Sequence, residues 1–174
     1  MFTWRITKYN PENRDDRGKY QNDEWTSCHD IGKVYNGKEF TANDYINVEN
    51  TYILAVLSFV NSANISTLKV KNLEKYNDSI KINEGSIEYT DEMIKLFERL
   101  EDDAVLEIEQ IEQLCRLILR EQVWCKLEDT NKLLIYFGYD YYMYISCLSK
   151  PDSIISLLEE RGLYIEELDS IFLP

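Results

Sequence analysis

The chain has 174 residues, a length that fits one domain and allows roughly 70% of the unfolded surface to be buried without disulfides or a structural metal. Its 44% hydrophobic and 13% aromatic residues exclude a disordered or low-complexity chain. The formal charge of −13 argues against binding to nucleic acid or to an anionic membrane, because like charges repel.

The first half of the chain opens with residues that alternate in polarity and so predict a strand with Trp4 and Ile6 on one face. Thr41 and Asp44 have the spacing of a helix capping box, and apolar residues recur at helical spacing after them. We expect a strand over 2–8, an exposed loop over 10–24, a helix over 42–63, a strand over 66–73, and a loop or short hairpin over 74–88.

The second half mixes helical and strand patterns without strict alternation, which is typical of an α+β fold. Pro151 suits the first turn of a last helix, and Gly162 suits its end. The other expected elements are helices over 90–100 and 109–121 and short strands over 105–108 and 163–168. We predict a single domain, 1–174, in which about four helices pack against a mainly antiparallel sheet centred on 122–146.

The centre of that sheet is dense in aromatic side chains. Six of the nine residues over 136–144 are tyrosine or phenylalanine, as in half-buried strands, and 129–131 and 138–140 suit reversals of the chain. The residues expected in the core are Leu133, Ile135, Met143 and Ile145, together with Val56, Leu57, Phe59 and Val60.

The last strand of this stretch should present tyrosines on one side only. Because alternate residues of a strand face opposite ways, Tyr142 and Tyr144 should share one face, and Tyr141, Met143 and Ile145 the other. The second set is expected in the core, which leaves the first set as candidates for exposure.

The cysteines and the single histidine form no recognisable catalytic or metal-binding pattern. The four cysteines are widely spaced in apolar surroundings, and we expect buried, reduced thiols. His29 directly follows Cys28, and neighbouring side chains usually point apart, so a turn anchored by Trp25 is the simpler interpretation. The six glycines form no phosphate-binding loop. We expect no catalytic residue, disulfide, metal, nucleotide or other cofactor.

Acidic residues concentrate towards the end of the sequence, where residues 101–174 hold 6 basic and 16 acidic side chains, a charge of −10. Such a charge would steer a basic protein towards the chain, and tyrosines would supply contact area. The candidate binding residues are Asp140, Tyr142, Tyr144, Tyr164, Glu166, Glu167 and Asp169. The alternatives are that the charge serves only solubility and that both faces of the tyrosine-rich strands are covered.

Three parts of the sequence resemble a family of small uncharacterised bacterial proteins: DEWTS with DIG within 23–32, LRE with WCKL within 119–127, and FGYDYYMY at 137–144. In size, acidity and lack of a catalytic motif the chain is also loosely similar to the acidic immunity proteins that neutralise toxins of competing bacteria. The resemblance implies no activity and no site residues.

The expected function is that of a non-catalytic interaction protein, an immunity-type inhibitor that binds a basic toxin or effector. The alternatives are a small hydrolase-like enzyme that uses His29 and Cys28, and a protein with a small-ligand pocket between helix 42–63 and the sheet. Arg5 and Lys8 interrupt the N-terminus, and no apolar run approaches about 20 residues, so we expect a cytoplasmic protein that does not enter a membrane. The sequence leaves the oligomeric state open.

Overall fold

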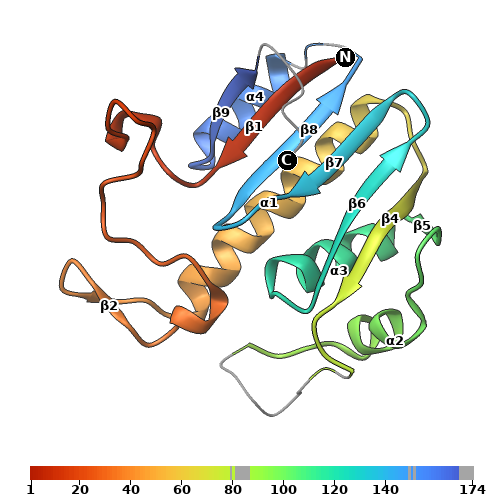
Figure 1. Cartoon of the computed structure of the whole chain (residues 1–174), viewed down its shortest axis with the longest axis horizontal. Coiled ribbons are helices and arrows are strands. Elements are labelled where there is room, and N and C mark those ends of the chain that lie inside the picture. The colour runs from red at the N-terminus through yellow and green to blue at the C-terminus, as the bar shows by residue number, and fades with distance from the viewer. Residues whose placement is uncertain (79, 81–86, 149, 151, 169–174) are drawn as a thin grey trace.

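The computed structural model describes residues 1–78, 80, 87–148, 150 and 152–168. Over these residues it shows four helices, a seven-stranded antiparallel sheet of strand order β5-β4-β6-β7-β8-β1-β9, and a separate hairpin of β2 and β3 (Figure 1). The predicted α+β fold, with an antiparallel sheet centred on 122–146 and four main helices, is confirmed.

The observed elements lie within a few residues of the expected ones, except for the hairpin of β2 and β3, which was not predicted. The strands are β1 (Phe2–Thr7), β2 (Val34–Tyr35), β3 (Lys38–Glu39), β4 (Thr67–Lys75), β5 (Val105–Glu107), β6 (Val123–Asp129), β7 (Leu133–Phe137), β8 (Tyr142–Cys147) and β9 (Tyr164–Leu168). The helices are α1 (Ala42–Ser62), α2 (Asp91–Arg99), α3 (Ile108–Leu119) and α4 (Asp152–Glu160). The expected first helical residue, Pro151, and residues 79 and 81–86 of the loop or hairpin expected over 74–88 lie outside the described residues.

The N-terminal strand β1 lies between β8 and β9, so segments from both ends of the sequence are neighbours in the sheet (Figure 1). Its register sets Trp4 opposite Ile145 and Ile6 opposite Met143. All four side chains are buried on the helix-covered face, as the alternation predicts.

Helix α1 begins with the capping box that the sequence predicts. The Thr41 hydroxyl accepts from the Asp44 N–H at 3.2 Å, and the Asp44 carboxylate accepts from the Thr41 N–H at 3.1 Å. The helix runs behind the sheet and buries Val56, Phe59 and Val60 against it (Figure 1). Leu57, which was also expected in the core, is only partly buried and packs at its margin. No helix of the described chain is both long and apolar enough to cross a membrane.

The loop over 10–24 is largely exposed, as its polar sequence predicts, but aromatic contacts attach it to the rest of the protein. Arg14 forms an isolated β-bridge with Tyr20, and the Tyr20 ring packs against that of Tyr9 with 4.8 Å between ring centroids. The Tyr20 hydroxyl also donates to the Glu24 carboxylate. The packing of Tyr20 against Tyr9 thus holds this loop against the rest of the protein.

An ion pair is enclosed between α1 and the end of α3. Glu49, on α1, is fully buried and accepts two hydrogen bonds from Arg120, at 2.7 and 2.8 Å, and one from Arg116 at 2.7 Å. The bidentate geometry offsets part of the cost of removing the carboxylate from water, and the hydrogen bonds link the two helices.

The two faces of the sheet differ sharply in what covers them. Helices α1, α3 and α4 lie behind one face (Figure 1), which carries the fully buried Leu127, Ile135 and Ile145. The opposite face carries Trp124 and Tyr144 among charged residues. An antiparallel sheet can tolerate this, because side chains alternate between a packed and a solvated side.

Candidate functional site

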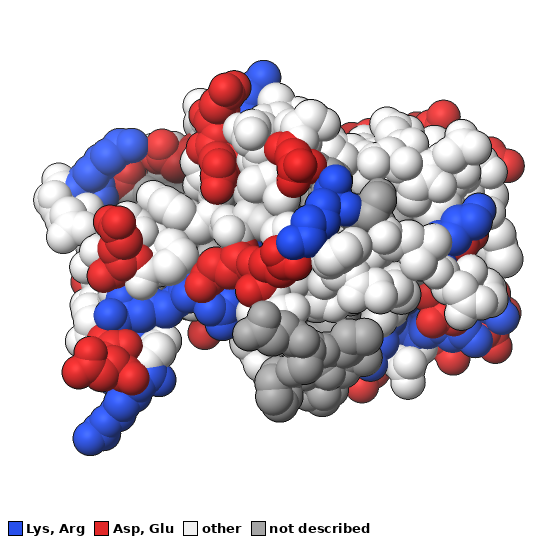
Figure 2. All heavy atoms as spheres, turned by 90° about the horizontal axis from the view of Figure 1, so that it is seen from above, with Lys and Arg blue, Asp and Glu red and all other residues white. Residues whose placement is uncertain are grey.

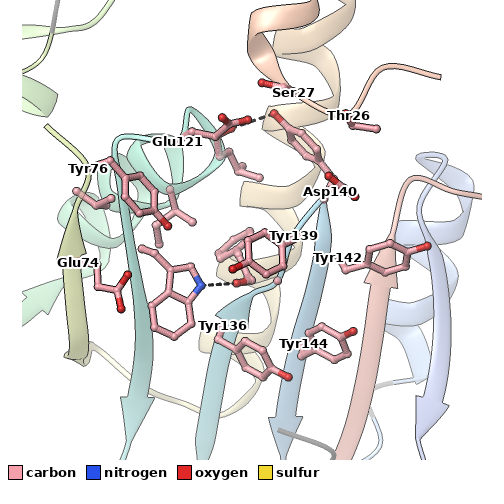
Figure 3. Close-up of a pocket in the computed structure, with 17 residues that line it drawn as sticks. Thr26, Ser27, Glu74, Tyr76, Glu121, Tyr136, Tyr139, Asp140, Tyr142 and Tyr144 are labelled. Carbon is pink, nitrogen blue, oxygen red and sulfur yellow. Dashed lines mark hydrogen bonds between the residues drawn. The ribbon is translucent and has the colours of Figure 1, made fainter. Parts of the chain in front are cut away.

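A pocket of about 1100 Å³ opens at one end of the sheet, beside the turn that joins β7 to β8 (Figure 3). Its walls also include the end of α3, the start of β6 and Thr26 with Ser27 from the N-terminal segment. The aromatic side chains that line it are Tyr76, Trp124, Tyr136, Phe137, Tyr139, Tyr141, Tyr142 and Tyr144. None of the lining residues belongs to α1, so this pocket is not the one envisaged between helix 42–63 and the sheet.

The β7–β8 turn presents two of the lining residues to solvent. Asp140 and Tyr141 have φ angles of 53° and 61°, and the Tyr142 N–H donates to the Tyr139 carbonyl at 3.1 Å. Two successive positive φ angles are typical of a type I′ turn, whose backbone twist matches the twist of the two strands that it joins. Tyr139 at the tip is 92% exposed, and the carboxylate of Asp140 is exposed beside it.

A positive φ is unusual for a residue as bulky as tyrosine, and tertiary contacts hold Tyr141 in it. Its buried ring packs edge-on against Trp25 at 4.9 Å and Tyr52 at 5.9 Å between centroids. Its hydroxyl donates to the Leu119 carbonyl at 2.9 Å. The ring therefore anchors the turn to the core, while Tyr139 and Asp140 project into the pocket region.

Trp124 forms a rigid part of the pocket wall. The indole Nε1–H donates to the Phe137 carbonyl at 2.6 Å, across β6 and β7. This hydrogen bond fixes the orientation of the indole while leaving the side chain only partly buried.

Two tyrosines form a stacked pair on the open face next to the pocket. The rings of Tyr136 and Tyr144 lie 4.8 Å apart with an interplanar angle of 10°. Gly138 allows this packing, because a Cβ at that position would lie 3.3 Å from the Tyr144 Cε2. Tyr142 lies on the same face. Its ring centroid is 5.8 Å from the guanidinium carbon of Arg5 and 5.7 Å from that of Arg14.

Three carboxylates surround the pocket: Glu74 at the end of β4, Glu121 after α3, and Asp140 in the turn (Figure 3). The pKa of Tyr76 is raised, first by burial and then by the negative charges of groups that include Glu74 and Glu121. The lining contains no lysine or arginine. A basic group outside the lining, Lys126, has its Nζ 6.0 Å from the centroid of Trp124 and 5.8 Å from that of Tyr136. The three lining carboxylates outnumber it and favour a cation.

The structure brings together three of the residues chosen from sequence. Asp140, Tyr142 and Tyr144 all line the pocket, and Tyr142 and Tyr144 lie on the face opposite to that of the buried Met143 and Ile145. The predicted division of this strand into a core face and a tyrosine face is confirmed. Both tyrosines are half-buried rather than fully open.

Of the other candidates, Tyr164, Glu166 and Glu167 lie on β9 at the far edge of the sheet and do not line the pocket. The Glu166 carboxylate forms ion pairs with Arg5 at 2.9 Å and with Arg14 at 2.8 Å, so its charge is used within the protein. Glu167 pairs with Lys150 at 2.7 Å. Tyr164, in the same strand, is half-buried, and Asp169 lies outside the described residues.

Sequence reasoning missed Glu74, Tyr76, Trp124 and Glu121 as pocket residues. The alternation in β6 places Trp124 on the face opposite to Val123 and Cys125, and this signal was present in the sequence. Glu121 has a φ of 57°, an uncommon conformation for a residue other than glycine. Glu74 and Tyr76 precede the first undescribed segment, and only the pairing of β4 with β6 brings them to the site.

Cys28 and His29 do not have the properties of a nucleophile and its base. Burial, and then the charge of Glu121, raises the pKa of the Cys28 thiol to about 12, whereas a reactive thiol needs a lowered pKa. The His29 side chain is 70% exposed, with Nε2 3.9 Å from a Glu121 carboxylate oxygen. Both residues belong to the short 3₁₀ turn Cys28–Asp30, which Ser27 and Asp30 cap reciprocally.

The remaining cysteines, Cys115, Cys125 and Cys147, are also buried, as expected for structural positions. Among the residues that the structure describes, no group of three histidine, cysteine or carboxylate side chains has the arrangement of a metal site.

The surface charge is distributed rather than gathered in one patch. Figure 2 shows lysine and arginine side chains beside aspartate and glutamate over the face seen from above. Several acidic residues of the C-terminal part form ion pairs within the protein, such as Asp103 with Lys69 at 2.8 Å and Lys71 at 2.6 Å. Total charge therefore does not identify a site, whereas the carboxylates of the pocket have no such basic neighbour in its lining.

Comparison with known proteins identified no matching family model, no similar curated protein and no similar solved structure.

Proposed function

We propose that this chain is a non-catalytic interaction protein that binds a basic protein partner at the pocket and the adjoining tyrosine face of the sheet. The observation that carries the proposal is a pocket lined by eight aromatic residues and three carboxylates, with no lysine or arginine in its lining. Tyrosine and tryptophan are enriched at the centres of protein interfaces, where they bury large areas at low entropic cost.

The charge on the molecule supports association with a partner of opposite sign. A net charge of −13 accelerates encounter with a basic protein at low salt, and the pocket carboxylates provide complementary groups at the contact. Both Glu74 and Asp140 are exposed and line the pocket, where a partner can reach their carboxylates.

The biological form that we propose is an immunity-type inhibitor, which neutralises a basic toxin or effector by binding it. A binder of this kind needs a rigid face and no catalytic group. The hydrogen-bonded Trp124 and the core-anchored turn at Tyr141 supply rigidity, and the buried, protonated thiol of Cys28 argues against the hydrolase alternative.

The test is a charge reversal at the pocket with a matched control. The first variant combines Glu74→Lys, Glu121→Lys and Asp140→Lys. The control combines Glu109→Lys, Glu159→Lys and Glu160→Lys, which are exposed positions on α3 and α4 and produce the same change in net charge.

The probe is the protein encoded by the reading frame adjacent to this gene, co-expressed and purified, and the measurement is titration calorimetry at two salt concentrations. We expect the pocket variant to lose at least about tenfold in affinity, a cost of about 1.4 kcal/mol, while the control loses much less. Equal affinities of the two variants would contradict the proposal.

A further inference from the structure

We infer that the pocket at the β7–β8 turn receives an arginine side chain of the partner as its anchoring group, an inference that rests on the proposed function. Three features carry it: rings without aromatic partners, carboxylates placed around them, and a cation held in the same way elsewhere in this protein.

The aromatic rings nearest the mouth are not stacked within the protein. Tyr9, Tyr45 and Tyr141 each pack against at least one other ring. In contrast, Tyr76 and Trp124 pair with no other ring of the described chain, although both line the pocket; the Trp124 ring has the Lys126 Nζ 6.0 Å from its centroid. The same holds for Tyr139, which is 92% exposed at the tip of its turn.

Unpaired rings of this kind offer flat faces to a ligand. Figure 3 shows Tyr139 near the middle of the lining residues, with Tyr76 and Glu74 to one side of it and Glu121 above. The charge of Glu74 and the polarity of the rim disfavour an apolar anchor, because burying a carboxylate against hydrocarbon costs free energy. A cation stacked on the rings and bonded to a carboxylate satisfies both kinds of group.

The protein already holds one of its own cations in this way. The Lys8 Nζ lies 3.9 Å from the centroid of Tyr9 and 4.0 Å from that of Trp25, with a Glu24 carboxylate oxygen at 3.4 Å. The Lys8 side chain is almost completely buried there. Burial lowers the pKa of the Lys8 ammonium to about 8, while the charges of Glu24, Asp30 and Asp140 act to raise it, so the charged form still predominates at neutral pH.

Arginine fits the pocket better than lysine for two reasons. Its guanidinium is planar, so it can stack on an aromatic ring while its five N–H donors remain directed to carboxylates at the edge. The carboxylates of Glu74, Glu121 and Asp140 come from three separate segments around the pocket, and only a group with several donors can reach more than one of them. A volume of about 1100 Å³ leaves room for the arginine side chain and its flanking backbone.

The experiment titrates the ¹⁵N-labelled full chain with three probes at low salt: the Nα-acetyl amides of arginine, lysine and citrulline. Citrulline has nearly the shape of arginine without its charge. The reporters are the Trp124 indole N–H, which is hydrogen-bonded to Phe137, and the Tyr139 amide. We expect saturable shifts with the arginine amide, binding of the lysine amide at least about fivefold weaker, and no saturation with the citrulline amide.

Two single variants locate the binding. Tyr139→Ala and Glu74→Gln should each weaken binding of the arginine amide at least about threefold, and both are expected to fold because neither side chain is buried. Tyr164→Ala and Glu109→Gln, away from the pocket, should leave it unchanged. Absence of saturation with arginine, equal binding of lysine or citrulline, or equal effects of the pocket and control variants would each overturn the inference.

The outcome is separable from that of the proposed function. If the adjacent gene product binds and the charge-reversed pocket abolishes its binding, but the arginine amide does not saturate, the function stands and the arginine anchor is wrong. If the arginine amide binds as expected and the adjacent product does not bind, the anchor stands and the proposed partner is wrong.

Discussion

Tyr45 and Tyr141 donate their hydroxyl hydrogens to the same acceptor, the backbone carbonyl of Leu119 at the end of α3, at 3.0 and 2.9 Å. Both rings are buried, and they come from α1 and from the β7–β8 turn. A carbonyl oxygen has two lone pairs and can accept both hydrogen bonds, so this carbonyl ties the pocket turn to two helices.

The shared acceptor predicts that the two tyrosines are coupled. Tyr45→Phe and Tyr141→Phe should each lower the free energy of unfolding by about 1 kcal/mol, because the other hydroxyl still satisfies the carbonyl. The double variant should lose about 1–3 kcal/mol beyond the sum, because a buried carbonyl is then unpaired. Urea unfolding of the four proteins measures this, and additivity within about 0.5 kcal/mol would contradict it.

The enclosed ion pair between α1 and α3 predicts a large asymmetry between two glutamates. Glu49→Gln should cost about 3–5 kcal/mol of unfolding free energy, because Arg120 would keep a buried charge without its counter-ion. Glu112→Gln is the control, since Glu112 pairs with Arg116 at 2.8 Å near the surface, where such a pair contributes about 0.5 kcal/mol or less. Similar costs for both substitutions, measured by urea unfolding, would show that the buried pair is not a major contributor.

The Glu166 cluster predicts a dependence of stability on pH. Burial acts to raise the pKa of Glu166, but hydrogen bonds and charge from Arg5 and Arg14 outweigh it, and the pKa is lowered from its ordinary value of 4.5. A lowered pKa in the folded state means that this contribution is fully present above pH 4.5 and is lost as the pH falls through the folded value.

The measurement compares the melting temperature of the wild type with that of Glu166→Gln from neutral to acidic pH. The wild type should be the more stable protein near neutrality, and the difference should shrink steadily below pH 4.5. The carboxylate is partly exposed, so the difference at neutral pH should be modest and smaller in high salt. A difference that does not change with pH would exclude ionisation of Glu166 as its cause.

A substitution of Asp140 should change binding of the partner without changing the stability of the protein. Asn tolerates the positive φ of this turn position as well as Asp does, so Asp140→Asn should change the unfolding free energy by less than about 0.5 kcal/mol. It removes one pocket charge and should weaken binding of the adjacent gene product several-fold at low salt and less at high salt. Asp16→Asn, at an exposed loop position, is the matched control. Equal binding by the two variants would exclude Asp140 from the interface.

The sequence by itself determined the elements whose signals are local. The start of α1 follows from Thr41 and Asp44, because a capping box involves only residues three positions apart. The faces of β8 follow from period-two alternation, which separates Tyr142 and Tyr144 from Met143 and Ile145 whatever the strand pairs with. These predictions needed no knowledge of distant parts of the chain.

Only the tertiary structure decided which distant segments meet. The insertion of β1 between β8 and β9 brings Arg5 to Glu166, and the return of the loop brings Arg14 to the same carboxylate, so a residue chosen for binding is neutralised within the protein. The pairing of β4 with β6 carries Glu74 to a turn more than sixty residues later in the chain. Periodicity reports which side of an element is buried, but it carries no information about its neighbour, because that choice depends on packing and loop closure over the whole chain.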